Sequence, residues 1–393
     1  MRVIGLMSGT SMDGIDAAAA DLEIDGEELA LRPLGSRSRP YPDELRQAIA
    51  AALPPALTTA EAICILDTEI GQALAEAAED ACRNLCRGEA DLVVSHGQTI
   101  VHWVEGRRAR GTLQLGQPSW IAERTGLPVI ADLRGRDIAA GGQGAPLVSL
   151  FDILLLGSED GISTRAALNL GGIANLTVIP PAPAAPFAFD AGPANALIDA
   201  AAGLVTGGKE LFDRNGKRGA SGAIHEGLLA HLLEDPYREL SPPKSTGKER
   251  FHLAYLLGAL KHAPGLDGDD LIATVTAHAA AIVARECLRY QVDELVVSGG
   301  GADNPTLMAM LNTRTPGVRM RRIDELGLAS SAKEAYAFAV LGYLTFRGLP
   351  ATIPSCTGAD HPSFLGGITP GRQALRLPPP AGRPPRRLRV IEP

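Results

Sequence analysis

A polar turn rich in small residues lies between two short apolar runs near the start of the 393-residue chain, in the segment GLMSGTSMDGID. Gly9 and Gly14 can take positive φ and let a ligand approach the backbone closely. The exposed N–H groups of such a turn form a concavity that binds anions, and Thr10 and Ser11 add hydroxyl donors. The segment therefore predicts a phosphate-binding hairpin.

The aspartates of this turn indicate a metal ion in addition to a phosphate. Asp13 and Asp16 would repel a bare phosphate, but they are compatible with one when Mg²⁺ lies between carboxylate and phosphate. We therefore predict Mg²⁺ at Asp13, held directly or through water. An ordinary polar β-turn is the alternative, and the similar turns found later in the chain count against it.

Short apolar runs typical of buried strands lead into Gly-rich turns three times along the chain. These turns follow Leu6, Leu170 and Ser298. A fourth run, at 187–189, leads in the same way into an acidic turn at Asp190, and a helix follows it. Repeated units in this order predict an α/β protein with two lobes that close on a nucleotide.

The remaining elements are predicted from apolar periodicity and from end signals. They are helices at 42–52, 59–87, 120–125, 221–233, 250–263, 269–290, 305–311 and 330–346, and strands at 15–20, 92–94, 129–131 and 176–179. Polar residues follow the strands at 92–94 and 129–131, where open α/β sheets bind ligands. Three glycines in four residues at 141–144 predict a hinge or a second site loop.

Composition narrows the class of protein. The chain is 45% hydrophobic and 21% charged, with a net charge of −8, which argues against a general surface for nucleic acid or anionic membranes. No apolar run approaches the roughly 20 residues of a membrane span, and no signal-peptide pattern opens the chain. Five scattered cysteines fit free thiols. We therefore expect a cytoplasmic protein.

Several motifs together carry a resemblance to a known family. They are GLMSGTSMDGID, SHGQTIVH, GGQGAPLV, LNLGGIANLT, FDAGPANALID, PPKSTGKERF, VSGGGADNP, SAKEAYAFA and a TGA segment at 357. In this order they resemble the anhydro-N-acetylmuramic acid kinase family over residues 1–371. The sequence departs from the family at DAGPAN, where DTGPGN is common, so we expect a slightly altered turn there.

The resemblance implies a two-lobed actin/hexokinase-like (ribonuclease H-like) fold with a nucleotide cleft between its lobes. We expect lobe I at 1–140 and 350–371 and lobe II at 141–349. A Pro- and Arg-rich tail at 372–393 is expected to be extended or disordered. The oligomeric state stays open, a homodimer included.

The resemblance also implies a reaction. ATP phosphorylates O6 of 1,6-anhydro-N-acetylmuramic acid while water opens the anhydro bridge, which yields N-acetylmuramic acid 6-phosphate and ADP in peptidoglycan recycling. Attack at C1 needs a carboxylate that activates the water, and Asp190 is our candidate. Mg²⁺ and the turn from Gly9 to Asp16 would position and neutralise the phosphates.

Other residues receive binding roles in this interpretation. Arg134 pairs with the lactyl carboxylate of the sugar as a fork. Glu334 holds substrate hydroxyls, and His96 and Gln98 line the sugar pocket. The predicted nucleotide-binding residues are Gly9, Thr10, Ser11, Met12, Asp13, Gly14, Ile15, Asp16, Gly172, Gly192, Gly299, Gly300 and Gly301.

Each of these residues has a structural alternative. Asp190 could be a plain turn or helix-cap aspartate, and His96 a structural hydrogen-bonding residue. Glu334 could favour the dipole of its helix from the first turn. Arg134 could belong to a surface ion-pair cluster with its charged neighbours.

Three alternative functions stay open at this stage. One is a kinase of a related anhydrosugar. Another is a metal-dependent relative such as the carbamoyl-transferring tRNA-modification proteins, but the HxxxH metal pair of those proteins is absent here, because His96 and His102 are six residues apart. The third is a nucleotide-binding module without kinase activity.

Overall fold

The computed structural model describes residues 1–9, 12–106, 108–157, 161–242, 244–247, 250–266 and 268–391. They form two compact units, Met1–Gly157 with Leu326–Pro393 (unit 1) and Ser158–Glu325 (unit 2). The helices are α1 (Asp43–Ala52), α2 (Ala60–Leu85), α3 (Pro118–Thr125), α4 (Leu133–Ala139), α5 (Ser149–Leu156), α6 (Asn195–Thr206), α7 (Lys217–Ser221), α8 (Glu226–Leu233), α9 (Leu253–Leu260), α10 (Gly268–Arg289), α11 (Pro305–Arg314), α12 (Lys333–Phe346) and α13 (Pro354–Thr357). Short 3₁₀ helices are η1 (Arg214–Gly216), η2 (Pro236–Glu239), η3 (Gly300–Asp303), η4 (Ile323–Leu326) and η5 (Ser330–Ala332).

Unit 1 is built on one mixed sheet. Its strands are β1 (Arg2–Ser8), β2 (Gly14–Asp25), β3 (Glu28–Pro40), β4 (Leu92–Glu105), β5 (Arg108–Leu115), β6 (Val129–Ala131), β12 (Gly367–Thr369) and β13 (Arg387–Val390). They run in the order β12-β6-β4-β1-β2-β3-β13, with β5 paired to β4. β1, β2 and β3 are antiparallel neighbours, whereas β4 and β6 continue in parallel on the other side of β1.

Unit 2 repeats this central order in a sheet of its own. Its strands are β7 (Arg165–Leu170), β8 (Ile173–Ile179), β9 (Phe187–Pro193), β10 (Glu294–Ser298) and β11 (Arg319–Arg322). They run β9-β8-β7-β10-β11, with β7, β8 and β9 antiparallel and with β10 and β11 parallel to β7. This duplicated topology is that of the actin/hexokinase-like ATPases, which confirms the predicted fold class.

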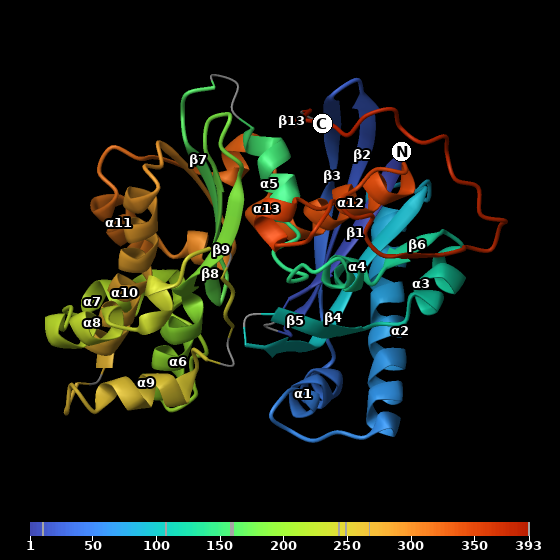
Figure 1. Ribbon diagram of the computed structural model, residues 1–393. Helices are drawn as coiled ribbons and strands as arrows, with labels where there is room; N and C mark the ends of the chain where they lie inside the picture. The colour runs from blue at the N-terminus through green and yellow to red at the C-terminus, as the bar shows by residue number, and fades with distance from the viewer. Residues whose placement is uncertain are drawn as a thin grey trace. The chain divides into compact units, whose positions relative to one another are not determined.

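A glycine lets helix α12 lie close to the sheet of unit 1. A Cβ atom at Gly5 in β1 would lie 1.9 Å from the carbonyl oxygen of Ala335. The adjacent Ile4 and Leu6 belong instead to a buried cluster with residues of α2. Because side chains alternate along a strand, α12 and α2 pack on opposite faces of the sheet (Figure 1). The first turn of α12, which carries Glu334, is therefore held near β1.

Helix α10 is the central helix of unit 2. It is long and apolar enough to cross a membrane by length and composition, with a mean hydropathy of 1.4, but 83% of that apolar window is buried inside the protein. It contacts α6, α7, α8 and α11 and shares a buried cluster with residues of β7, β8 and β9. A helix that is apolar on all sides is expected in such a core.

The boundaries of the units differ from those we expected. They lie at 157/158 and 325/326 rather than at 140/141 and 349/350. The glycine-rich loop at 141–144 lies inside unit 1, because Gly144 N donates to Asp137 Oδ2 at 2.7 Å and Gln143 N donates to the Thr357 carbonyl at 2.8 Å. Helix α12 also belongs to unit 1, because of its close packing on β1.

Several elements extend beyond their predicted ends. β4 continues from 94 to 105, and β9 continues from 189 to 193, so polar residues assigned to turns lie within strands. The tail is partly ordered: β13 pairs in parallel with β3, and its Leu388 is buried. Arg387 and Arg389 of β13 both contact Glu28. β3 was not predicted, since its second half is polar and exposed.

Candidate active site

The turn after β1 begins at Gly9. Its carbonyl accepts hydrogen bonds from Met12 N at 3.2 Å and from Gln98 Nε2 at 3.3 Å. Met12 has a positive φ of 57°, so the chain reverses at a residue other than glycine. Thr10 and Ser11, the predicted hydroxyl donors, lie outside the described residues.

Two other residues of this segment have packing roles. Gly14 does not use positive φ, contrary to our expectation; a Cβ atom there would lie 2.4 Å from the carbonyl oxygen of Arg39, so the close pairing of β2 with β3 requires glycine. Ile15 is 1% exposed and lies in the buried cluster with α2. Its side chain therefore supports the hairpin from within the core.

The two aspartates of the turn have different environments. Asp13 is exposed, whereas Asp16 is half-buried in β2. Burial raises the pKa of Asp16, a hydrogen bond with Ser38 opposes this effect, and the charge of Asp13 adds to it. Two neighbouring carboxylates, one of them open to solvent, are oxygen donors of the kind that Mg²⁺ takes together with substrate phosphates.

Gln98 is hydrogen-bonded to the residues at which the turn begins. Its side chain is fully buried in β4 and accepts a hydrogen bond from Ser8 Oγ at 2.7 Å. Its amide nitrogen donates to the carbonyls of Gly9 (3.3 Å) and Thr99 (3.2 Å). Gln98 thus joins the end of β1 to β4, a contact that the prediction of a sugar-lining role did not include.

The buried His96 of β4 and the half-buried Arg134 of α4 form a hydrogen-bonded pair. Arg134 Nε donates to His96 Nε2 at 2.9 Å, and Arg134 Nη1 donates to the Gly144 carbonyl at 2.6 Å. His96 Nδ1 lies 2.8 Å from the Gly97 carbonyl, so the neutral tautomer with a proton on Nδ1 satisfies both contacts. Burial, aided by the charge of Arg134, lowers the pKa of His96 to about 3.

Glu334 shares this environment. It lies half-buried in the first turn of α12. Burial raises its pKa; the charges of Lys333 and Arg134 oppose that effect, whereas those of Asp16 and Asp152 add to it. The charges of Asp16, Arg134 and Glu334, predicted residues from β2, α4 and α12, therefore interact within unit 1.

A buried ion pair fixes the start of α12, and sequence reasoning did not find it. Lys333 Nζ lies 2.7 Å from Asp152 Oδ1, and both side chains are almost fully buried. Removal of one partner would leave an uncompensated buried charge, which typically costs about 3–5 kcal/mol. Lys333 directly precedes the predicted site residue Glu334, and this position is the sequence feature that could have pointed to Lys333.

Asp190, the predicted base, lies in β9 of unit 2 rather than in a turn. It pairs with Asn175 of β8 beside a register shift. Asn175 Nδ2 donates to Asp190 Oδ1 at 2.8 Å, and Thr246 N donates to Oδ2 at 2.9 Å. These two donors hold the carboxylate in one orientation. Asn175 and Thr246 are further residues of this site that sequence reasoning did not assign.

Two further predicted glycines, in the turn before β8 and in β9, organise the start of α6. The Gly172 carbonyl accepts hydrogen bonds from Ala194 N at 2.9 Å and Ala196 N at 3.0 Å. Gly192 has a positive φ of 148°, and a Cβ atom there would lie 3.0 Å from Ile282 Cδ1. Both glycines therefore position the segment after Asp190.

The three glycines after β10 are not equivalent. A Cβ atom at Gly299, which has a φ of 82°, would lie 2.4 Å from Asn169 Oδ1, and one at Gly301 would lie 2.7 Å from Leu170 Cβ. These two glycines are required by packing against β7. Gly300 is exposed, and a Cβ atom there would meet no atom within 4 Å. Gly300 thus has exposed backbone and open space beside it.

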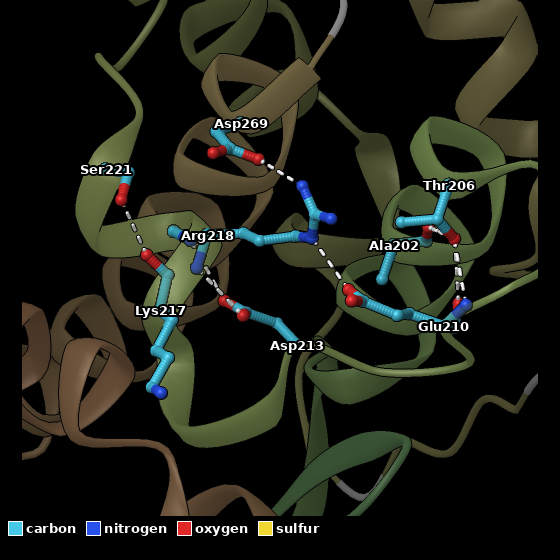
Figure 2. Close-up of polar contacts among 9 residues, drawn as sticks. Ala202, Thr206, Glu210, Asp213, Lys217, Arg218, Ser221 and Asp269 are labelled. Atoms are coloured by element: carbon cyan, nitrogen blue, oxygen red, sulfur yellow. Dashed lines mark hydrogen bonds and ion pairs between the residues drawn. The ribbon is translucent and has the colours of Figure 1, made fainter.

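An open pocket of ≈640 Å³ lies beside the start of α11. It is lined by Gly219, Ala220, Gly222, Ile224, Glu226, Pro305, Thr306, Ala309 and Met310. Figure 2 shows how its α7 wall is fastened: Arg218 bridges Glu210 (2.7 Å) and Asp269 (2.9 Å), and Asp213 accepts hydrogen bonds from the backbone N–H groups of Arg218 (3.0 Å) and Gly219 (2.9 Å).

The family of the chain follows from comparison with known proteins. A family model described as anhydro-N-acetylmuramic acid kinase matches residues 1–371. The chain belongs to the anhydro-N-acetylmuramic acid kinase family. This confirms the predicted resemblance.

Two relatives show the extent of the similarity, and both are named anhydro-N-acetylmuramic acid kinase. The one from Streptomyces coelicolor is 60% identical over 391 residues, covering 100% of this chain and 99% of the relative. The one from Rhodococcus erythropolis is 57% identical over 381 residues, covering 95% and 96%. A solved structure of the activator of 2-hydroxyisocaproyl-CoA dehydratase from Clostridium difficile aligns over 86% of this chain and 93% of that chain, with 12% identity and a TM-score of 0.42, values too low to bear on function.

One departure from the anhydro-N-acetylmuramic acid kinase pattern has a structural account. At DAGPAN, Ala191 and Ala194 replace the threonine and glycine that the family commonly has. Ala191 is 2% and Ala194 0% exposed, and both belong to the buried cluster of unit 2. Their methyl groups contribute to packing, while Asp190 keeps both hydrogen-bond donors.

Proposed function

We propose that this protein phosphorylates O6 of 1,6-anhydro-N-acetylmuramic acid with ATP while water opens the 1,6-anhydro bridge, giving N-acetylmuramic acid 6-phosphate and ADP. We assign this reaction to peptidoglycan recycling in the cytoplasm. The observation that carries the proposal is membership of the anhydro-N-acetylmuramic acid kinase family over residues 1–371. The charged cluster of unit 1 and the held carboxylate of Asp190 supply the groups that the reaction needs.

Asp190 would serve as the base. Water attacks C1, the bond between C1 and the bridge oxygen breaks, and Asp190 takes the proton of the water. The electron pair of the broken bond stays on O6, which takes the γ-phosphoryl group, so ADP leaves and no separate acid is needed. A carboxylate whose two oxygens are held by Asn175 and Thr246 is suited to this task, because a general base must be aimed at one proton.

Arg134 and Glu334 would hold the sugar. Contacts with His96 and Gly144 use Nε and Nη1 of Arg134 and fix the plane of its guanidinium. Because these contacts use one N–H of Nε and one of Nη1, Nη2 and the second N–H of Nη1 can bind the lactyl carboxylate end-on, in the planar geometry that arginine favours. Glu334, in the same environment, would accept hydrogen bonds from sugar hydroxyls.

The phosphates would lie at the turn that follows β1. Asp13 would hold Mg²⁺, directly or through water, with Asp16 behind it. Bound Mg²⁺ neutralises the charge that develops on the phosphates. Gln98 fastens Ser8 and Gly9 to β4, so the end of β1 that leads into the turn is held in place.

Adenosine would lie against Gly300 and the pocket beside α11. Gly300 is open, and the pocket is lined by Pro305 and Thr306 of α11 and by residues at the end of α7. A nucleoside needs close access to the backbone there, and the absent side chain at position 300 provides it.

Alanine substitutions separate ligand access from packing at these glycines. We expect Gly300→Ala to leave the melting temperature unchanged and to raise the KM for ATP by about tenfold, because its methyl group meets the nucleoside and ~1.4 kcal/mol of binding is lost. Gly301→Ala should instead destabilise the protein by about 1–3 kcal/mol through overpacking against Leu170. Steady-state kinetics and thermal unfolding check both. An unchanged KM for ATP in Gly300→Ala would exclude this place for adenosine.

Isotope labelling tests the reaction directly. The protein is mixed with ATP, Mg²⁺ and the anhydrosugar in ¹⁸O-water, and the product is analysed by mass spectrometry before its reducing end exchanges with solvent. We expect one ¹⁸O on C1 and none in the phosphate. Unlabelled product transferred into ¹⁸O-water for the same time corrects for exchange.

The alternatives give different results in this experiment. A product without a label on C1, or with a label in the phosphate, would contradict the coupled mechanism. Equal turnover of levoglucosan, which lacks the lactyl and acetamido groups, would indicate a kinase of related anhydrosugars. ATP binding with no sugar-dependent ADP release would indicate a module without kinase activity.

A further inference from the structure

The segment at 244–247 makes two hydrogen bonds to Asp190. Asp190 N donates to the Lys244 carbonyl at 3.0 Å, and Thr246 N donates to the Asp190 carboxylate at 2.9 Å. Tyr237, in η2, donates its hydroxyl to the Asp190 carbonyl at 2.9 Å. The backbone and the carboxylate of Asp190 are thus both held by residues 47 to 56 positions further along the chain.

The side chain of Lys244 is almost fully buried in this cluster. Its ammonium lies 4.9 Å from the ring centroid of Tyr237 and 5.6 Å from that of Phe189, distances at which cation–π attraction operates. It also donates to the carbonyls of Tyr237 (3.5 Å) and Arg238 (3.3 Å). Burial lowers the pKa of Lys244, and the carboxylate of Glu286 opposes that shift.

The far side of the cluster is fixed as well. Asp235 accepts hydrogen bonds from Tyr237 N at 2.9 Å and from the Tyr255 hydroxyl at 3.0 Å. Arg250 contacts the same carboxylate at 2.6 Å and lies over the Tyr237 ring at 5.5 Å. The Tyr237 ring therefore has cations on it and an anchored backbone, so it is a rigid support for Lys244.

We infer that Lys244 is a positioning residue for Asp190: it ties the segment at 244–247 to η2 and β9, so that the N–H group of Thr246 meets the carboxylate and aims it. The inference rests on the proposed function, since it takes Asp190 as the base. A buried ammonium is costly unless its partners compensate it. Here the partners are the carbonyls and rings next to Asp190, so the attraction of the Lys244 ammonium holds the segment at 244–247 beside Asp190.

Two substitutions test the inference, and a third serves as the control. Lys244→Met keeps a flexible apolar side chain in the aromatic cluster and removes the ammonium. Tyr237→Phe removes the hydroxyl that donates to Asp190. Tyr255→Phe is the matched control, because it removes a hydroxyl from the same cluster that donates to Asp235 instead.

We expect Lys244→Met to lower kcat by about 10- to 100-fold, the loss typical of a catalytic group that shifts by about 1 Å. KM for ATP and for the anhydrosugar should stay within about twofold of wild type, because the binding residues are untouched. Tyr237→Phe should lower kcat by a smaller factor with the same unchanged KM values. Tyr255→Phe should keep the wild-type kcat at a comparable melting temperature, because Tyr237 N and Arg250 still hold Asp235.

The kinetic results of the variants distinguish a positioning role of Lys244 from a purely structural one. A folded Lys244→Met protein with wild-type kcat overturns the inference, as does an equal loss of kcat in Tyr237→Phe and Tyr255→Phe, which would indicate general loosening of the cluster. If Lys244→Met does not fold, the pair of tyrosine variants decides. A wild-type protein without sugar-dependent ADP release would contradict the proposed function itself, and this result is distinct from those of the variants.

Discussion

We expect Asp190→Asn to lower kcat by about a thousandfold, which lies within the ~10²- to 10⁴-fold that a general base contributes. The amide cannot take a proton from water. Its nitrogen would also face one of the two donors, Asn175 Nδ2 or Thr246 N, that now hold the carboxylate. ATP binding should persist, because the nucleotide is assigned to other residues. Single-turnover kinetics measures the loss of catalytic rate, and a binding titration measures the affinity for ATP.

The control for this substitution is Asp293→Asn. Asp293 lies in the same unit, is exposed, and likewise accepts a hydrogen bond from a backbone N–H, that of Thr164 at 2.8 Å. Its amide variant should keep the wild-type kcat. Full activity of Asp190→Asn would remove Asp190 from the role of base, whereas equal losses in both variants would point to a structural cause.

Arg134→Lys should raise the KM for the anhydrosugar by about 100-fold, equivalent to the loss of ~3 kcal/mol of charge-assisted hydrogen bonding. Lysine keeps the charge but offers a point donor instead of a planar fork. It also cannot make the contacts with His96 and Gly144 that hold the guanidinium in place. KM for ATP should stay unchanged. Steady-state kinetics with each substrate varied in turn separates the two constants.

Arg136→Lys is the matched control for Arg134→Lys. Arg136 lies two residues further on the same helix, α4, and its side chain is exposed. Both constants should keep their wild-type values in this variant. An unchanged KM for the sugar in Arg134→Lys would show that Arg134 belongs to a structural network only, the alternative that its charged neighbours suggested.

Local patterns predicted most of the regular elements. The helices α1, α2 and α10 were predicted within two residues of their observed bounds, because apolar spacing along a helix depends only on nearby residues. The hairpin of β1 and β2 was also predicted, but β2 extends to Asp25 instead of ending at 20. β4 was predicted too short because the burial of its later residues depends on partners that are distant in sequence. His96 and Gln98 are polar yet buried within the strand, where Arg134 and Ser8 satisfy them.

The division into units could not be predicted from local signals. Glycines at 141–144 indicated flexibility, but Asp137 and Thr357 fasten that loop. The Pro- and Arg-rich tail lacked periodicity, yet β13 completes the edge of the sheet beside β3. Thr357 and β3 lie far along the chain from the segments that they hold, so those segments themselves carry no sign of them.

The family, the fold class and the chemically active groups could be read from the residues alone: glycine turns after strands, aspartates beside them and one arginine with a glutamate. Tertiary structure alone decided which of these groups meet. Arg134 and His96 are 38 residues apart, Gln98 and Gly9 89, and Thr246 and Asp190 56. Hydrogen bonds across such separations depend on the order of strands in the sheet and on close helix packing, neither of which a short stretch of sequence specifies.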